Sequence, residues 1–231
     1  LTRYSSELAE DAVVAIGDDL AGEIAYAFAL KEDECGFNGD GTSAFGGITG
    51  VRERLRGLDA SPANVAGLVV AGGVGYASGY GSITLADFHK VVGRLPVYAR
   101  RRARWFMSST FFAEVAQRLM YAAGGATVQA LALGTSERFL GFPVEIVQVM
   151  PATSATGQVC CLLGDLALAS MLGDRRHTTI AFSEHVNFAE DELAIRGTER
   201  FDIVVHDVGN ASATASERRS GPVVGLITGA A

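Results

Sequence analysis

The residues of this 231-residue chain that come nearest to a chemical motif lie in glycine-rich loops. Gly41 and Gly46 have the spacing of the first half of a phosphate-binding loop, G-x-x-x-x-G. That loop needs Lys and then Ser or Thr after its second glycine, to reach the phosphates and a magnesium ion. The chain has Gly47 and Ile48 at these positions. We therefore predict a glycine-rich turn that reverses the chain, and not a nucleotide site.

A second glycine cluster has part of a dinucleotide-binding fingerprint. Gly73, Gly75 and Ser78 follow the apolar run LVVA. The third glycine of the fingerprint is missing, the next helical pattern starts several residues later, and no acidic residue follows at the required distance. Ser78 also lies outside the G-x-S-x-G pattern of a nucleophile elbow. A nucleotide-binding enzyme is therefore only a remote alternative.

The histidines do not form a metal-binding pattern. They are scattered along the chain: His89, His177, His185 and His206. None of them has the spacing of metal ligands. The sequence therefore predicts no catalytic residue, no cofactor, no metal and no enzyme.

One stretch of the chain is strongly basic. Arg100, Arg101 and Arg102 are consecutive, and Arg104 follows. The favoured interpretation is a solvated strand end whose arginines have salt-bridge partners. The alternative is a contact with nucleic acid or with an acidic neighbouring subunit.

Composition narrows the class of protein. A hydrophobic content of 48% and a charged content of 19% are typical of a globular chain. The formal net charge of −7 argues against a protein that wraps duplex DNA. No apolar run approaches the roughly 18 to 20 residues of a membrane span. The three cysteines, Cys35, Cys160 and Cys161, give no disulfide framework and are expected to be small core residues.

The first part of the chain predicts a long helix. Apolar residues recur every four positions: Leu8, Ala12, Ile16, Leu20, Ile24 and Phe28. A helix from Ser6 to Cys35 would be roughly 45 Å long at about 1.5 Å per residue. Gly36 is expected to close it in the left-handed conformation. Leu20 is expected to bury against the strands that end the chain.

Helical and strand patterns are mixed in the rest of the chain. Thr84 is expected to cap a helix that Pro96 ends, and Ser109 or Thr110 to open another. Strands are predicted in RARWFMSS, GFPVEIVQVMP, LAIRGTERFDIVV and PVVGLIT. Because there is no strict βαβ repeat, the predicted fold class is α+β.

The order of these patterns resembles a known family, the major capsid proteins of tailed bacteriophages. In that family a spine helix ends in a glycine loop. The matching residues here are Asn38, Gly39, Asp40, Gly41, Thr42, Gly47 and Ile48. Further matches follow in the family's order: RARWFMSSTFFAEVAQRL, GFPVEIVQVMP and the segment from GDLALAS to FDIVV. The resemblance covers almost the whole chain.

The resemblance implies two domains. Residues 1–57 and 191–231 would form a peripheral domain, and residues 58–190 an axial domain that faces the symmetry axes of a shell. Family members also carry an N-terminal arm and an extended loop before the spine helix, and the resemblance implies that both are missing from this sequence. One branch of the family forms a covalent cross-link to that loop. Asp191 stands at the matching position, so no cross-link is expected. The chain alone is expected to be a monomer or a small oligomer.

The implied function is structural. The chain would be the major capsid protein of a tailed phage or prophage, assembling into pentamers and hexamers of an icosahedral shell around DNA, without sequence specificity. Its other partners would be scaffold, protease and portal proteins, with no membrane. It would be assembled in the bacterial host cytoplasm and reside in the virion. An encapsulin-type compartment is the alternative. The candidate residues for structure and assembly are Leu20, Asn38, Gly39, Asp40, Gly41, Arg100, Arg101 and Arg102.

Overall fold

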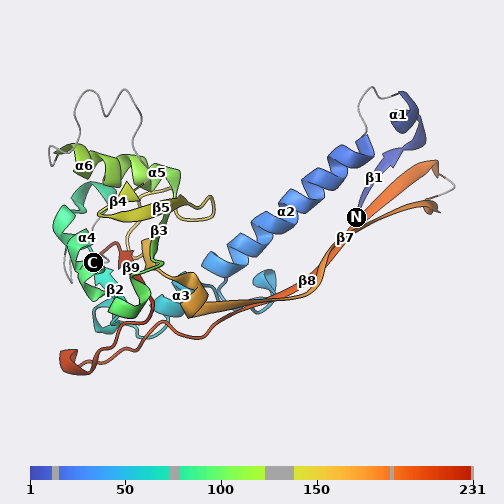
Figure 1. Cartoon of the computed structure of the whole chain (residues 1–231). Coiled ribbons are helices and arrows are strands. Elements are labelled where there is room, and N and C mark those ends of the chain that lie inside the picture. The colour runs from blue at the N-terminus through green and yellow to red at the C-terminus, as the bar shows by residue number, and fades with distance from the viewer. Residues whose placement is uncertain (12–15, 73–78, 123–137, 188–189, 230–231) are drawn as a thin grey trace.

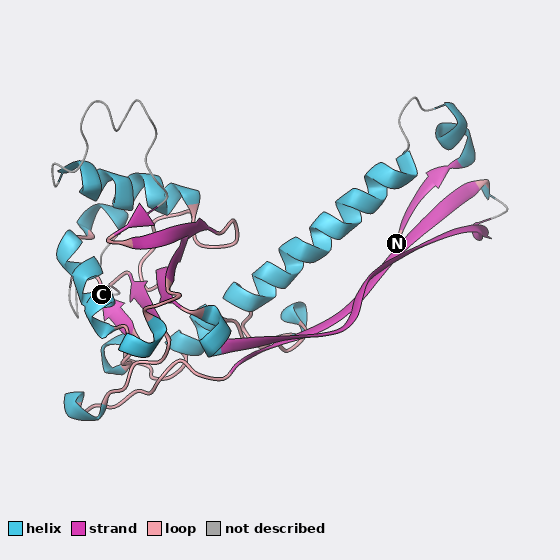
Figure 2. Cartoon of the chain, in the orientation of Figure 1, coloured by secondary structure: helices cyan, strands magenta, loops and turns pink. Residues whose placement is uncertain are grey.

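A sheet-rich body and a long arm that extends from it make up the chain (Figure 1). This computed structural model describes residues 1–11, 16–72, 79–122, 138–187 and 190–229. Figure 2 shows that the arm is a long helix beside a strand ribbon, whereas strands and short helices alternate in the body. Mixed helix and sheet confirm the predicted α+β class.

The body is built on a six-stranded sheet in the order β2-β9-β6-β3-β5-β4. Its strands are β2 (Leu68–Val70), β3 (Arg104–Met107), β4 (Arg138–Phe139), β5 (Phe142–Ile146), β6 (Val159–Gly164) and β9 (Val223–Ile227). All six residues of β6 are buried. β9 pairs in parallel with β2 and antiparallel with β6, so the last strand of the chain lies inside this sheet.

Short helices surround the sheet. They are α3 (Val51–Arg56), α4 (Leu85–Arg94), α5 (Ser109–Phe111), a π-helical turn (Phe112–Gln117), α6 (Arg118–Ala122) and α8 (Leu166–Ala169). Single 3-10 turns lie at Ser43–Phe45, Pro62–Asn64, Tyr80–Ser82, Val97–Ala99 and Ala215–Glu217. The predicted Thr84 cap is confirmed, because the Thr84 N–H donates to the Asp87 carboxylate at 3.1 Å.

An aromatic cluster fills the core of the body. The ring of Phe88 meets Trp105 edge-on at 5.6 Å and Phe139 at 4.8 Å, and all three side chains are buried. The Trp105 indole N–H donates to the Phe139 carbonyl at 2.9 Å, so its polar atom is satisfied. Cys160 and Cys161 are buried in the same core, as the sequence predicted.

The arm consists of helix α2 (Ile16–Asn38) beside a ribbon of two long strands, β7 (Ser170–Asn187) and β8 (Glu192–Val205). At the far end β1 (Thr2–Ser5) pairs with β8, giving the order β1-β8-β7, and α1 (Ser6–Asp11) follows β1. Figure 1 shows α2 running along the ribbon. They approach closely at Gly197, where an added Cβ would lie 2.6 Å from Ile24 and 2.7 Å from Phe28.

One predicted helix end is wrong. Gly36 does not end α2, because the helix continues to Asn38, and Gly36 instead faces Ile203 of β8. The prediction that Ser109 or Thr110 opens the next helix is confirmed, since α5 begins at Ser109. Its cap is Ser108, whose Oγ accepts from the Phe111 N–H at 3.2 Å. The first predicted turns of the long helix fall partly on residues 12–15, outside the described residues.

Candidate functional site

Asn38, a sequence candidate, lies where the arm joins the body. It is the last residue of α2, and its Nδ2 donates to the Val149 carbonyl at 2.6 Å. Its Oδ1 accepts from the guanidinium of Arg52, whose Nε donates to the Val159 carbonyl at 3.0 Å. Burial lowers the pKa of Arg52 from its ordinary value. These bonds fix the end of α2 to α3 and to the first strand residue of β6.

Sequence reasoning missed Arg52 and Val149. Val149 is 111 residues from Asn38, so no local pattern connects the two. Arg52 is closer in sequence, but an arginine in an ordinary helix pattern gives no sign that its side chain turns inward.

Gly39 and Gly50 close the glycine loop. The Gly50 N–H donates to the Gly39 carbonyl at 2.8 Å, and the Gly41 N–H donates to the Ile48 carbonyl at 3.0 Å. A Cβ at Gly39 would lie 2.5 Å from the Ile48 carbonyl oxygen and 2.6 Å from that of Cys35. Only glycine therefore allows this close approach of backbone to backbone. The predicted chain reversal is confirmed, since Asp40 and Thr49 form an antiparallel bridge.

Asp40 and Gly41 form the exposed tip of this loop. Gly41 has φ +80°, a conformation that favours glycine. The Asp40 carboxylate accepts from the Thr42 N–H at 2.9 Å, and bonds from Thr42 lower the pKa of Asp40. Its charge is thus used to shape a turn. The other glycine cluster, Gly73 and Gly75 with Ser78, lies outside the described residues.

The basic run is divided among separate roles. Arg100 donates to the carbonyls of Val92 at 3.0 Å and Leu95 at 3.3 Å, at the end of α4. Arg102 lies 4.0 Å from the Asp165 carboxylate, whereas Arg101 is exposed and makes no ion pair with a described residue. These contacts favour a solvated, salt-bridged strand end over a single binding patch.

Leu20 lies in the middle of the apolar stripe of α2. It is half-buried, as are Ile16, Ile24 and Phe28. Ile24 and Phe28 contact the ribbon at Gly197. Of the 23 residues in α2, only Cys35 and Phe37 are buried, at the end next to the body. The stripe therefore packs on one side and remains partly open to solvent.

A carboxyl pair joins α2 to the ribbon below that stripe. Burial raises the pKa of Glu32, and the nearby Glu199 carboxyl raises it further. Glu199 Oε1 accepts from the Thr178 hydroxyl at 3.2 Å, while its Oε2 is buried and makes no hydrogen bond among the described residues. Asp33 and Asp174 add negative charge nearby. The arm thus carries a like-charge contact in its interior.

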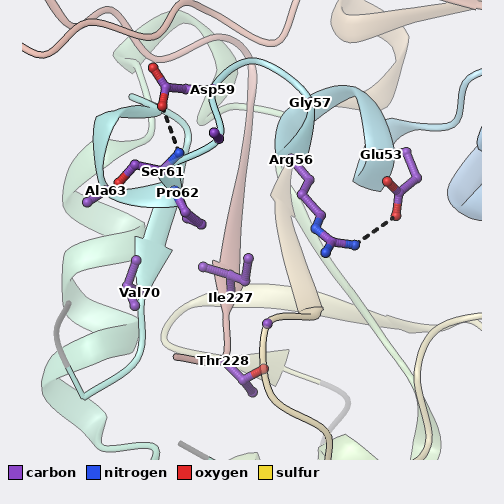
Figure 3. A pocket seen from close by; sticks show the side chains of 12 residues that line it. Glu53, Arg56, Gly57, Asp59, Ser61, Pro62, Ala63, Val70, Ile227 and Thr228 are labelled. Carbon is purple, nitrogen blue, oxygen red and sulfur yellow. Dashed lines mark hydrogen bonds and ion pairs between the residues drawn. The ribbon is translucent and has the colours of Figure 1, made fainter. Parts of the chain in front are cut away.

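The body has a cleft of about 440 Å³ beside α3, lined in part by Val70 and Ile227 (Figure 3). Its polar side chains are already paired. Arg56 lies 3.7 Å from Glu53, and the Asp59 carboxylate accepts from the Ser61 N–H at 2.7 Å. The described residues contain no cluster of His, Cys, Asp and Glu that could hold a metal ion. The cleft therefore presents no free charged group aimed at a ligand.

Comparison with known proteins identifies the architecture. The sequence profile of the phage capsid family matches residues 1–211. The chain belongs to the phage capsid family. No curated protein matches it at a significant level.

Solved capsids share its fold. The capsid of an empty GTA particle, computed with C5 symmetry, superposes with a TM-score of 0.73 at 21% identity, over 99% of this chain and 71% of that one. Mycobacterium phage Bobi gives 0.61 at 17% identity, over 99% and 70%. The capsid of cyanophage Pam1 gives 0.56 at 11% identity, over 98% and 73%.

Membership of the capsid family confirms the structural role expected from the sequence. The chain is a capsid protein of the virion, and neither an encapsulin-type compartment nor a nucleotide-binding enzyme is favoured. None of the described helices is both long and apolar enough to span a bilayer. The candidate residues at the junction and in the glycine loop support the subunit's own fold.

Proposed function

We propose that this subunit forms pentamers and hexamers of a closed icosahedral shell around DNA, and that it acts without catalysis. The observation that carries the proposal is the arm. Its helix and ribbon extend away from the core and keep their apolar stripe only half-buried. A surface of this kind is stabilised when the same contact repeats around a symmetric assembly.

The two-domain division belongs to the same proposal. The arm would be the peripheral domain and the body the axial domain. The strand pairings support boundaries that follow contacts: β7 goes with β8 in the arm, and β9 goes with β2 and β6 in the body. The division expected from the sequence was residues 1–57 and 191–231 for the peripheral domain and 58–190 for the axial domain. The proposed division differs from it in two strands: β7 moves to the peripheral domain and β9 moves to the axial domain.

DNA, scaffold, protease and portal proteins are the proposed partners, with assembly in the bacterial host cytoplasm. With a net charge of −7, the subunit is expected to enclose DNA without gripping it through a broad basic face. This fits packaging without sequence specificity.

Electron microscopy of the full-length protein produced in bacteria tests the proposal. We expect closed particles of uniform size, and DNA in filled particles that resists added nuclease until the shells are disrupted. Sedimentation velocity measures the fraction of protein in particles. Soluble, folded protein that forms no particle with or without the proposed partners would overturn the shell function. Particles whose DNA is always digested would overturn only the enclosure of DNA.

A further inference from the structure

Two arginines lie directly opposite each other on the ribbon. Arg176 of β7 is the register partner of Arg200 of β8, and both are exposed. Neither forms an ion pair with a described residue. Like charges directly opposite in an antiparallel pair destabilise it. The isolated subunit therefore gains no stability from placing these two charges together.

Arg196 extends this charge along the same face. Side chains alternate along a strand, so Arg196 and Arg200 share the face opposite to Glu199. Glu199 faces Glu32 of α2, which places the arginines on the ribbon face turned away from the helix. We call Arg176, Arg196 and Arg200 the arginine row. Asp202 follows on the same face, so the row ends in one acidic residue.

A cluster of opposite sign lies on α2. Asp18, Asp19 and Glu23 are exposed, off the apolar stripe, and form no ion pair with a described residue. Asp18 and Asp19 are in the first turn of α2, where the helix dipole favours acids. Glu23 lies beyond that turn and repels Asp19 at the i, i+4 spacing. We call Asp19 and Glu23, which lie one turn apart on the same side of the helix, the acidic row; Asp18 precedes it in the first turn.

The two rows cannot meet within one subunit. Ile24 and Phe28 press the apolar side of α2 against the ribbon at Gly197, and the rows lie off this contact. A helix about 10 to 12 Å thick, together with the ribbon, separates them. A second copy lying beside the first can bring one row onto the other.

We propose that the acidic row of one copy docks on the arginine row of the next. This inference rests on the proposed shell function and names the contact between neighbours. The contact joins two different surfaces of the same chain, so it is heterologous and continues from copy to copy until a ring closes. It relieves two repulsions that the isolated subunit retains.

Nucleic acid is the other polyanion that could meet the arginine row. Three arginines release few counterions, and a chain of net charge −7 repels DNA at longer range. A short acidic row matches the size of the arginine row better, so a second copy is the favoured occupant.

Charge reversal tests the contact. The helix reversal is Asp19→Lys with Glu23→Lys, and the ribbon reversal is Arg176→Glu with Arg200→Glu. Each should raise the protein concentration needed for half-maximal assembly by about tenfold or more, because like charges then face each other. A chain with both reversals should assemble like the unaltered chain. An equal mixture of the two single reversals should restore the contact only between unlike variants, and therefore in rings with an even number of copies, where the two variants alternate. The control is Arg54→Glu with Arg219→Glu. It changes the net charge by the same amount as the ribbon reversal, but at exposed sites outside the arm, and should leave assembly unchanged.

A single substitution separates docking from folding. Arg176→Glu places opposite charges across the strand pair with Arg200. It should raise the thermal unfolding temperature of the unassembled subunit while weakening assembly. If this variant is more stable and also assembles better than the unaltered chain, the arginine pair has no docking role.

Disulfide trapping detects the contact before shells form. Chains with Glu23→Cys are mixed with chains with Arg196→Cys and oxidised mildly. A mixed dimer should form, and Arg54→Cys should replace Arg196→Cys only poorly. The three native cysteines are buried and serve as an internal background.

The outcomes distinguish the two proposals. If the unaltered protein gives neither shells nor trapped dimers, the proposed function and this contact fail together. Shells that tolerate every reversal, with no trapped dimer, overturn the contact alone. A ribbon reversal that assembles normally but protects less DNA would assign the arginine row to nucleic acid and also overturn the contact.

Discussion

The body and the arm are stabilised in different ways. Every residue of β6 is buried, and the strand lies between β9 and β3 within the sheet. The 23-residue helix α2 buries only Cys35 and Phe37, both next to the body. The body therefore has a core of its own, whereas the arm packs one thin layer on another. A part of this kind depends more on what lies beside it in an assembly.

Charges show the same contrast. In the body, the carboxylate of Asp87 is nearly fully buried, yet it bonds with Thr84 at 2.8 Å and Lys90 at 3.0 Å. In the arm, Glu32 meets Glu199, and Arg176 stands opposite Arg200. The body pairs this buried charge internally, whereas the arm leaves like charges together on both faces of the ribbon.

The largest expected effect is in the body. Phe88→Ala removes a buried ring that contacts Trp105 and Phe139 and should cost about 3 to 5 kcal/mol of unfolding free energy. The unfolding temperature should fall by roughly 6 to 20 °C, as calorimetry would measure. The matched change in the arm is Tyr26→Ala, at a side chain 56% exposed, and it should cost less than about 1.5 kcal/mol. Equal losses would show that the arm is as well packed as the body.

The next effect is at the junction. Gly39→Ala would force a Cβ against the carbonyl oxygens of Ile48 and Cys35, at 2.5 and 2.6 Å. We expect a loss of about 3 kcal/mol in denaturant unfolding. Gly22→Ala is the control, since a Cβ there meets nothing within 4 Å. It should stabilise the helix by about 0.5 to 1 kcal/mol. A harmless Gly39→Ala would mean that the loop closes differently.

A smaller loss is expected along the arm. Leu20→Asp puts a charge into a half-buried site and should cost about 1 to 2 kcal/mol. Leu20→Ala, which removes apolar area but adds no charge, should cost less. Both values come from urea unfolding of the unassembled subunit. Complete loss of folded protein with Leu20→Asp would show that the stripe is buried as deeply as the body's core.

The smallest effect is a gain and depends on pH. The pKa of Glu32 is raised above its ordinary value of 4.5, so the folded chain holds its proton more tightly than the unfolded chain. Stability therefore decreases as pH rises from about 4.5 through the raised pKa. Glu32→Gln should remove a repulsion of roughly 0.2 to 1 kcal/mol at pH 7, raising the unfolding temperature by about 0.4 to 4 °C. Near pH 4 the two proteins should unfold together. A gain that persists unchanged at pH 4 would contradict this account.

Local patterns in the sequence predicted much of the fold. Thr84 and Pro96 bound α4, and the strand predicted in LAIRGTERFDIVV is β8. The glycine loop was expected to reverse the chain because its glycines are close together, and Gly41 indeed has a positive φ. Such features depend on neighbours in sequence.

Features that depend on distant partners could not be predicted this way. Nothing near Asn38 indicates Val149, and nothing in β7 indicates that Arg176 will stand opposite Arg200. Register is set by the whole ribbon, including its bulges between Asp174 and Thr179. The order of strands in the body, with β9 between β2 and β6, likewise depends on packing across the chain.

The close contact at Gly197 determines how near helix α2 lies to the ribbon. A side chain there would meet Ile24 and Phe28 at 2.6 to 2.7 Å, so those side chains or the helix itself would have to shift by roughly 1 Å to reach ordinary contact. An outward shift of the helix would tilt α2 about its anchored end at Asn38. In the proposed shell, a small tilt repeated in every copy of a ring would change the angle between neighbours and therefore the radius at which the shell closes. The absence of a side chain at Gly197 would then contribute to particle size.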